Sequence, residues 1–175
     1  MALIVGRAYN SGKNMDTHPW WQGTRGEWYF VVQMILLALI LLAPLAPGQP
    51  GWAGALSLPA RGLGLLLGLA GLALAVAGLL GLGSNLSVLP HPKDDAQLVQ
   101  SGVYGLARHP IYGGLIVGAA GWALLTNSLL ALFLALALLL FFEAKSRREE
   151  RQLLARFPAY ADYRRRVRKF FPFLY

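Results

Sequence analysis

Residues 112–142, YGGLIVGAAGWALLTNSLLALFLALALLLFF, decide the fold of this chain. Two uncharged apolar runs, 112–125 and 129–142, are separated only by residues 126–128, TNS. So short a connection turns one helix back antiparallel to the other. No Pro or Gly interrupts 129–157, so the second helix reaches about 40 Å, beyond the roughly 30 Å apolar core of a bilayer. The stretch therefore predicts a membrane hairpin whose second helix emerges with a charged end.

Two more apolar runs precede this hairpin, at 28–43 and 62–83. A spanning helix needs about 20 residues, in a range of about 17 to 25, so 28–43 and 112–125 span a membrane only if flanking residues join them. We expect an all-α integral membrane helical bundle, in a single domain, with about four transmembrane helices. The charged residues after 142 form its C-terminal cytosolic helical extension, and Pro158 separates from it a short basic helix at 160–171 that lies on the membrane surface.

The composition supports a membrane protein and excludes several kinds of chemistry. Hydrophobic residues make up 56% of the chain and charged residues 14%, whereas soluble domains carry about 25% charged residues. The chain has no Cys, which excludes disulfides, thiolate metal sites and Cys nucleophiles. Residues 1–27 are too polar for a secretory signal, so we expect the first apolar run to remain as a membrane anchor.

Positive charge gathers beside the last apolar run. The net charge is +8, and ten of the sixteen Lys and Arg residues lie between Lys145 and Lys169. The loop 44–60 and the turn 126–128 carry none. Because Lys and Arg favour the cytoplasmic side, this pattern predicts a multi-pass protein with both termini cytoplasmic. We expect no nucleic-acid partner, since no fold for binding one is visible.

Small residues and ion pairs predict how the helices pack. Gly114, Gly118 and Gly121 share one helix face, which favours close helix packing, with a face kept small for a lipid chain or cofactor as the alternative. In the charged end of the fourth helix, Glu143 with Arg147 and Lys145 with Glu149 have the i,i+4 spacing of helix-stabilising pairs.

The segment 102–113, GVYGLARHPIYG, places Arg, His and two Tyr at the mouth of a membrane helix. His109 precedes Pro110 and is therefore held extended, while Pro110 can open the third helix. A helix N-terminus attracts anions, and Arg108 adds donors there. A ligand site and an interfacial anchor for lipid headgroups both explain this segment.

Two other polar segments are candidates. The loop 84–93, with Asn85, Ser87 and His91, is either part of a site or a solvated connection. The run 147–151, RREER, is either functional or a pure ion-pair network. We expect no metal, since the chain has no HExxH and its three His are far apart in sequence.

Residues from about 81 to the end resemble the isoprenylcysteine carboxyl methyltransferase and phospholipid methyltransferase superfamily, especially its prokaryotic members. Each matching motif is short, and their order and spacing carry the resemblance. The matching residues are the loop 85–92, Leu98, Gly102-Val103-Tyr104, Arg108-His109-Pro110-Ile111-Tyr112-Gly113, Glu149-Glu150 with Leu153, Phe157, Tyr160, Tyr163, Val167 and Pro172. Val103 and Pro158 depart from the family pattern, which often has Pro and Gly there.

The resemblance implies S-adenosylmethionine as cofactor and a lipid or lipophilic small molecule as methyl acceptor, at the cytosolic membrane face. It divides the chain into an N-terminal tail and helical hairpin (1–83) and a cofactor-binding catalytic half (84–175). Catalytic roles fall on Glu150 and Arg166, and substrate contacts on Arg147, Tyr160 and Tyr163. The implied cofactor-binding residues are Leu98, Val103, Tyr104, Arg108, His109, Tyr112, Gly113 and Glu150.

Two alternatives remain at this point. The C-terminal sequence 171–175, FPFLY, is similar to that of the related sterol reductases, which use NADPH. A small membrane scaffold without enzymatic activity is the other alternative, in which the polar motifs are anchors. The methyl acceptor, the attacking atom and the oligomeric state stay open.

Overall fold

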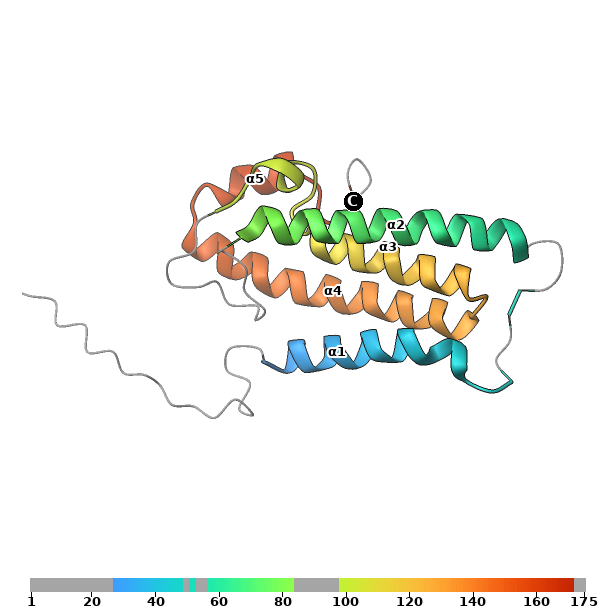
Figure 1. The fold of residues 1–175 in the computed structure, drawn as a ribbon. Helices are drawn as coiled ribbons and strands as arrows, with labels where there is room; N and C mark the ends of the chain where they lie inside the picture. The colour runs from blue at the N-terminus through green and yellow to red at the C-terminus, as the bar shows by residue number, and fades with distance from the viewer. Residues whose placement is uncertain (1–26, 49–50, 53–56, 84–97, 172–175) are drawn as a thin grey trace, which may run out of the picture.

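The structure, a computed structural model, describes residues 27–48, 51–52, 57–83 and 98–171. Within these ranges the chain is helical, and the loop 85–92 that the sequence singled out lies outside them. The helices of the bundle run side by side, and a further short helix lies at one end of the bundle (Figure 1). The elements are α1 (Glu27–Leu42), η2 (Ala43–Leu45), α2 (Ser57–Leu82), η5 (Gly102–Gly105), α3 (Pro110–Leu125), α4 (Leu129–Arg156) and α5 (Tyr160–Arg166).

The predicted hairpin is confirmed as α3 and α4. Pro110 is the first residue of α3, where its missing N–H removes no helical hydrogen bond. The turn uses Asn127 at φ 56°, and the Ser128 side chain then caps α4 by accepting a hydrogen bond from the N–H of Ala131 at 3.1 Å. α4 continues without a break to Arg156, as the absence of Pro and Gly predicted.

Within the described ranges, three helices are long and apolar enough to cross a membrane. They are Glu27–Leu45 (α1 continued by η2), Ser57–Leu82 and Leu129–Arg156, whereas α3 is apolar but has only 16 residues. Their outward surfaces expose large apolar side chains such as Leu80 and Phe133, which suits contact with lipid. The protein is thus an all-α integral membrane bundle of three long helices and one shorter helix.

Glycines let α2 and α3 pack almost backbone to backbone. A Cβ added at Gly64 would lie 2.7 Å from the carbonyl oxygen of Gly121, and one added at Gly114 would lie 2.6 Å from that of Gly71. Neither contact leaves room for a side chain, so close helix packing is confirmed for Gly114 and Gly121, whereas a Cβ at Gly118 has no neighbour within 4 Å. These contacts between Gly64, Gly71, Gly114 and Gly121 form a glycine seam, which fixes the start of α3 against the end of α2.

Gly114→Ala should therefore lower the thermal midpoint of the protein in detergent. The added methyl group meets backbone atoms of α2, and overpacking of this kind costs about 1–3 kcal/mol. Gly118→Ala is the matched control, because a Cβ there has no neighbour within 4 Å and Ala favours a helix. Equal midpoints for the two variants would contradict the seam.

The first helix packs on the other side of the hairpin. α1 lies against α4, whereas α2 lies against α3 (Figure 1). Ile40 of α1 is buried in a cluster with Ile116 of α3 and Leu138 of α4. The two N-terminal helices therefore flank the α3–α4 hairpin rather than packing mainly on each other.

The C-terminal segment differs from the sequence prediction. Helix α5 ends at Arg166 and does not continue to Phe171. The chain then runs beside residues 107–109, where the N–H groups of Arg108 and His109 donate to the carbonyls of Arg168 and Lys169 at 2.8 and 2.9 Å. The backbone of His109 (φ −126°, ψ 63°) accordingly lies outside the extended conformation expected before Pro110. This backbone pairing straps the chain after α5 to the start of α3.

Candidate functional site

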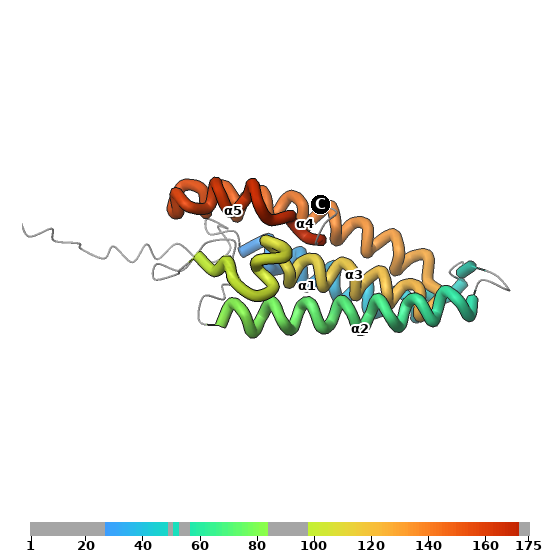
Figure 2. Tube along the Cα trace, turned by 90° about the horizontal axis from the view of Figure 1, so that it is seen from above, coloured from blue at the N-terminus to red at the C-terminus, as the bar shows by residue number. Residues whose placement is uncertain are grey.

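The polar residues of the two main motifs meet at one end of the bundle. Arg108 and His109 immediately precede α3, and Glu149 and Glu150 lie on the charged part of α4. η5 and α5 lie at the same end in both views of the fold (Figures 1 and 2). The sequence separation of these motifs is about 40 residues, so it is the α3–α4 hairpin that brings them together.

Glu150 is the centre of this cluster. Its Oε1 accepts a hydrogen bond from Nε of Arg108 at 2.9 Å and lies 3.2 Å from Nε2 of His109. Its Oε2 lies 3.4 Å from Nε of Arg164 on α5. Only 4% of the Glu150 side chain is exposed, so these basic partners stabilise a carboxylate that has lost most of its water.

Glu149 holds a second set of partners. The hydroxyl of Tyr112 donates to its Oε1 at 2.6 Å, and Nδ1 of His109 lies 3.7 Å from its Oε2. The imidazole of His109 is therefore placed between two carboxylates, and its ring is parallel to that of Tyr112 with centroids 5.5 Å apart. The adjacent acids of α4 thus form ion pairs and hydrogen bonds with residues at the start of α3, and both the functional and the ion-pair interpretations of the run 147–151 stay predictions.

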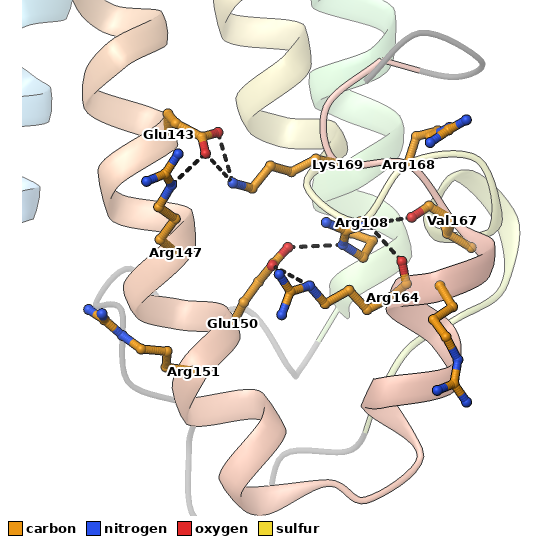
Figure 3. Close-up of a pocket in the computed structure, with 10 residues that line it drawn as sticks. Arg108, Glu143, Arg147, Glu150, Arg151, Arg164, Val167, Arg168 and Lys169 are labelled. Atoms are coloured by element: carbon orange, nitrogen blue, oxygen red, sulfur yellow. Dashed lines mark hydrogen bonds and ion pairs between the residues drawn. The ribbon is translucent and has the colours of Figure 1, made fainter.

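A cavity of about 580 Å³ opens beside Glu150 (Figure 3). Seven basic side chains and two carboxylates line it, together with Val167. The lining residues are Arg108, Glu143, Arg147, Glu150, Arg151, Arg164, Arg165, Val167, Arg168 and Lys169. Its volume lies within the range of about 300–1,000 Å³ that is usual for small-molecule sites, and the excess of positive charge favours an anionic group.

Arg108 connects the cavity to the C-terminal segment. Its guanidinium donates to the backbone carbonyl of Arg164 at 3.2 Å and to that of Val167 as well as to Glu150. The planar guanidinium presents several donors in fixed directions, which lets it bind a carboxylate and two carbonyls together. Arg108 thus holds α3, α4 and the residues after α5 in one arrangement.

Sequence reasoning missed the pairing of Glu143 with Lys169. Nζ of Lys169 donates to both carboxylate oxygens of Glu143 at 2.8 Å, and the lysine side chain is 9% exposed. The predicted pair of Glu143 with Arg147 also forms, at 2.7 Å. Glu143, Arg147 and Glu150 follow each other at helical spacing on one face of α4, a signal that could have added Glu143 to the predicted site.

Three tyrosines that the sequence assigned to the site serve as packing. The hydroxyl of Tyr104 donates to the carbonyl of Gly78 at 3.2 Å, and that of Tyr163 donates to the carbonyl of Tyr104 at 2.6 Å. Tyr160 is 1% exposed and packs edge to face on Tyr163. Burial raises the pKa of Tyr104 to about 12 and also raises the pKa of both α5 tyrosines, so all three stay protonated near neutral pH.

The other predicted residues divide between the cavity and its surroundings. Arg147 lines the cavity, whereas Arg166 does not and instead approaches the carbonyl of Asp162 within α5. Gly113 is buried against the backbone of Phe170, where a Cβ would overlap the carbonyl oxygen. Val103 packs near the end of α2, and Leu98 is half-buried ahead of η5. None of these last three lines the cavity.

The described residues contain no group of three His, Asp or Glu side chains that could hold a metal ion. The carboxylates instead face arginines and a histidine, which suits an organic ligand that carries both charges. Such a ligand would meet a cationic cavity with Glu150 and Glu143 as acceptors in its wall.

Comparison with known proteins gives a family match over most of the chain. Residues 60–160 match the phospholipid methyltransferase family. This range contains α3, α4 and five residues of the charged cluster: Arg108, His109, Tyr112, Glu149 and Glu150.

Individual relatives come from two groups. The chain is 37% identical to the cobalt-zinc-cadmium resistance protein CzcN of Cupriavidus metallidurans over 148 residues, which are 84% of this chain and 62% of that protein. It is 35% identical over 148 residues to the nickel-cobalt-cadmium resistance protein NccN of Alcaligenes xylosoxydans, covering 84% and 63% of the two chains. It is 36% identical over 115 residues to the mouse protein-S-isoprenylcysteine O-methyltransferase, covering 63% and 41%. The chain therefore spans less than two thirds of the length of each of these relatives.

Proposed function

The chain belongs to the phospholipid methyltransferase family, and from that membership we propose that it transfers a methyl group from S-adenosylmethionine to a lipophilic acceptor. The observation that carries this proposal is the junction of Arg108 and His109 with Glu149 and Glu150 beside the cationic cavity. A scaffold with interfacial anchors has no need of a histidine buried between two carboxylates. The sterol-reductase alternative has no such feature in its favour.

The residues around the cavity fit the charges of this cofactor. S-adenosylmethionine carries a carboxylate, an ammonium group and a sulfonium, and the bound group supplies an activated methyl. We assign its carboxylate to Arg108 and Arg164, and its positive groups to Glu150. His109, Tyr112 and Glu149 orient Glu150 and the wall behind it, whereas Leu98, Val103, Tyr104 and Gly113 support the wall from outside.

An anionic group of the acceptor would bind the remaining basic side chains. Arg147, Arg151 and Arg168 line the cavity, and all three are exposed. We favour them over Arg166 for this role, because Arg166 points along its own helix toward Asp162. Tyr160 and Tyr163 then act by fixing α5 rather than by touching the acceptor.

Orientation supplies most of the catalysis in this proposal. Methyl transfer requires the attacking atom to approach in line with the carbon–sulfur bond, and a fixed cavity supplies that alignment. A carboxylate acceptor needs no base, whereas an amine or hydroxyl acceptor needs one. His109 and Glu150 are the candidates within reach, and Glu150 is a weak base because its burial, which raises its pKa, is outweighed by its contacts with His109 and Arg108, which lower the pKa to about 2. The acceptor enters from the bilayer and the cofactor from the cytosol.

Calorimetry of the purified protein with S-adenosylhomocysteine and, separately, with NADPH tests the proposal. We expect binding heat with S-adenosylhomocysteine and none with NADPH. Binding heat with NADPH alone would contradict the proposed methyl transfer and support the reductase alternative. Silence with both ligands would favour the scaffold.

The proposed orientation places both termini in the cytoplasm, with residues 1–83 as an N-terminal tail and helices and 84–175 as the catalytic half. Because the chain has no Cys, single cysteines can be introduced at Ser57 and Ala161 and exposed to an impermeant thiol reagent on intact cells. We expect labelling of Ser57→Cys only, since the basic residues around Ala161 favour the cytoplasmic side. Labelling of Ala161→Cys only, with both sites reactive after lysis, would reverse the orientation.

A further inference from the structure

A buried lysine joins the first helix to the cluster around His109. Lys145 of α4 is 2% exposed, and its Nζ donates to Oε1 of Gln33 on α1 at 2.8 Å. The sequence predicted that Lys145 would pair with Glu149, one turn further along α4. The side chain instead forms its hydrogen bond with Gln33 on α1, while Glu149, which binds Tyr112 and His109, lies close enough to attract the ammonium electrostatically.

The same lysine lies over the ring of Tyr112. Its Nζ is 5.0 Å from the ring centroid, a distance at which a cation is attracted by the π-system. The other neighbours of this ring are Phe142, at a centroid distance of 4.3 Å, and His109 at 5.5 Å. A cation at the ring also draws electron density from the phenol and strengthens the donation of its hydroxyl to Glu149, so the position of Lys145 bears on the whole cluster.

We propose that Gln33 and Lys145 are positioning residues, through which α1 holds Tyr112 in the orientation that places His109 for cofactor binding. The chain of contacts runs from Gln33 to Lys145, Tyr112 and then Glu149 and His109. A buried ammonium without an acceptor is costly, so Lys145 keeps this position only while Gln33 is present. The role assigned to α1 is notable because Gln33 lies outside the residues that match the family, 60–160.

The inference rests on the proposed function for its effect on cofactor binding, but the coupling itself can be measured without ligand. The first readout is the imidazole resonance of His109 in protein with isotope-labelled histidine, assigned by its loss in His109→Gln. The second is the affinity for S-adenosylhomocysteine. Thermal midpoints in detergent report whether each variant folds.

Gln33→Leu should move the His109 resonance and weaken S-adenosylhomocysteine binding about tenfold. Gln33→Glu keeps an acceptor for Lys145, so its His109 resonance and its affinity for S-adenosylhomocysteine should match those of the wild-type protein. Tyr29→Leu is the matched control, because Tyr29 also joins α1 to α4, through Phe141 and Arg148, without contact to Tyr112. It should leave both readouts unchanged.

A double variant separates positioning from mere packing. Gln33→Leu with Lys145→Met removes the unpaired charge, so the thermal midpoint should recover while the resonance stays displaced. Return of the resonance to its wild-type position in the double variant would overturn the inference, as would an equal shift in Tyr29→Leu. If the Gln33→Leu substitution displaces the resonance but the wild-type protein binds no S-adenosylhomocysteine, the coupling stands and the proposed cofactor is refuted.

Discussion

Glu150→Ala is expected to abolish measurable binding of S-adenosylhomocysteine, with an affinity loss of well over tenfold. The substitution removes the carboxylate that Arg108, His109 and Arg164 share. The loss removes the acceptor assigned to the positive groups of the cofactor and leaves the largely buried Arg108 and His109 without their carboxylate, a change that destabilises a fold by about 3–5 kcal/mol. Titration calorimetry of the purified variant is the measurement, with its thermal midpoint recorded in parallel.

Glu149→Ala is the matched control for that experiment. Glu149 is more exposed, with 16% of its side chain accessible, and its contact with His109 is longer, at 3.7 Å. We expect a smaller loss of affinity, of about tenfold or less. Glu150→Gln guards against a variant that fails to fold, since it retains an acceptor for Arg108 without the charge. Wild-type affinity in folded Glu150→Gln would reduce Glu150 to a structural ion partner.

His109→Ala should weaken S-adenosylhomocysteine binding at least tenfold while the protein remains folded, a difference of about 1.4 kcal/mol. Both ring nitrogens of His109 approach carboxylates, at 3.2 Å for Glu150 and 3.7 Å for Glu149. Without the imidazole these two acids repel each other across an empty space, and the wall of the cavity loses its shape. Its backbone pairing with Lys169 survives the substitution, so α3 still starts correctly.

Two further variants test the role of the imidazole. His109→Gln keeps a donor near the position of Nε2 and should retain more affinity than His109→Ala. His109→Trp keeps an interfacial side chain but cannot fit between the two carboxylates, so it should lose binding. Normal binding by a folded His109→Trp variant would restore the headgroup-anchor interpretation of the segment 102–113.

Local signals explain why the hairpin was predictable from the sequence. Pro110 marks the start of α3, and Ser128 supplies the cap of α4. An uninterrupted helix from 129 then follows from the absence of Pro and Gly. Each of these effects acts within a few residues, so no knowledge of the rest of the chain is needed.

Long-range contacts explain what the sequence did not reveal. Glu143 and Lys169 are 26 residues apart, and Gln33 and Lys145 are 112 apart. No pattern along the chain indicates such pairs, because helix packing decides which side chains meet. The end of α5 at Arg166 is also due to a long-range contact. The carbonyls of Arg168 and Lys169 accept hydrogen bonds from the N–H groups of residues 108 and 109, and this pairing competes with a longer helix. Arg166 does not line the cavity, whereas its neighbours Arg164 and Arg168 do, and the role of Arg166 stays a prediction.

The way in which the four helices pair limits how the bundle can move. α2 is locked to α3 by the glycine seam, and α1 is attached to α4 by the Gln33–Lys145 bond and apolar packing. The α3 and α4 helices in turn share an apolar core that contains Ile116, Leu138 and Phe142. Arg108 and His109 lie at the start of α3 and the Glu149–Glu150 pair lies on α4, so any gap that opened between these two helices would stretch the contacts of the charged cluster. A bulky apolar molecule could therefore enter between α3 and α4 only if the contacts of the charged cluster were strained or broken.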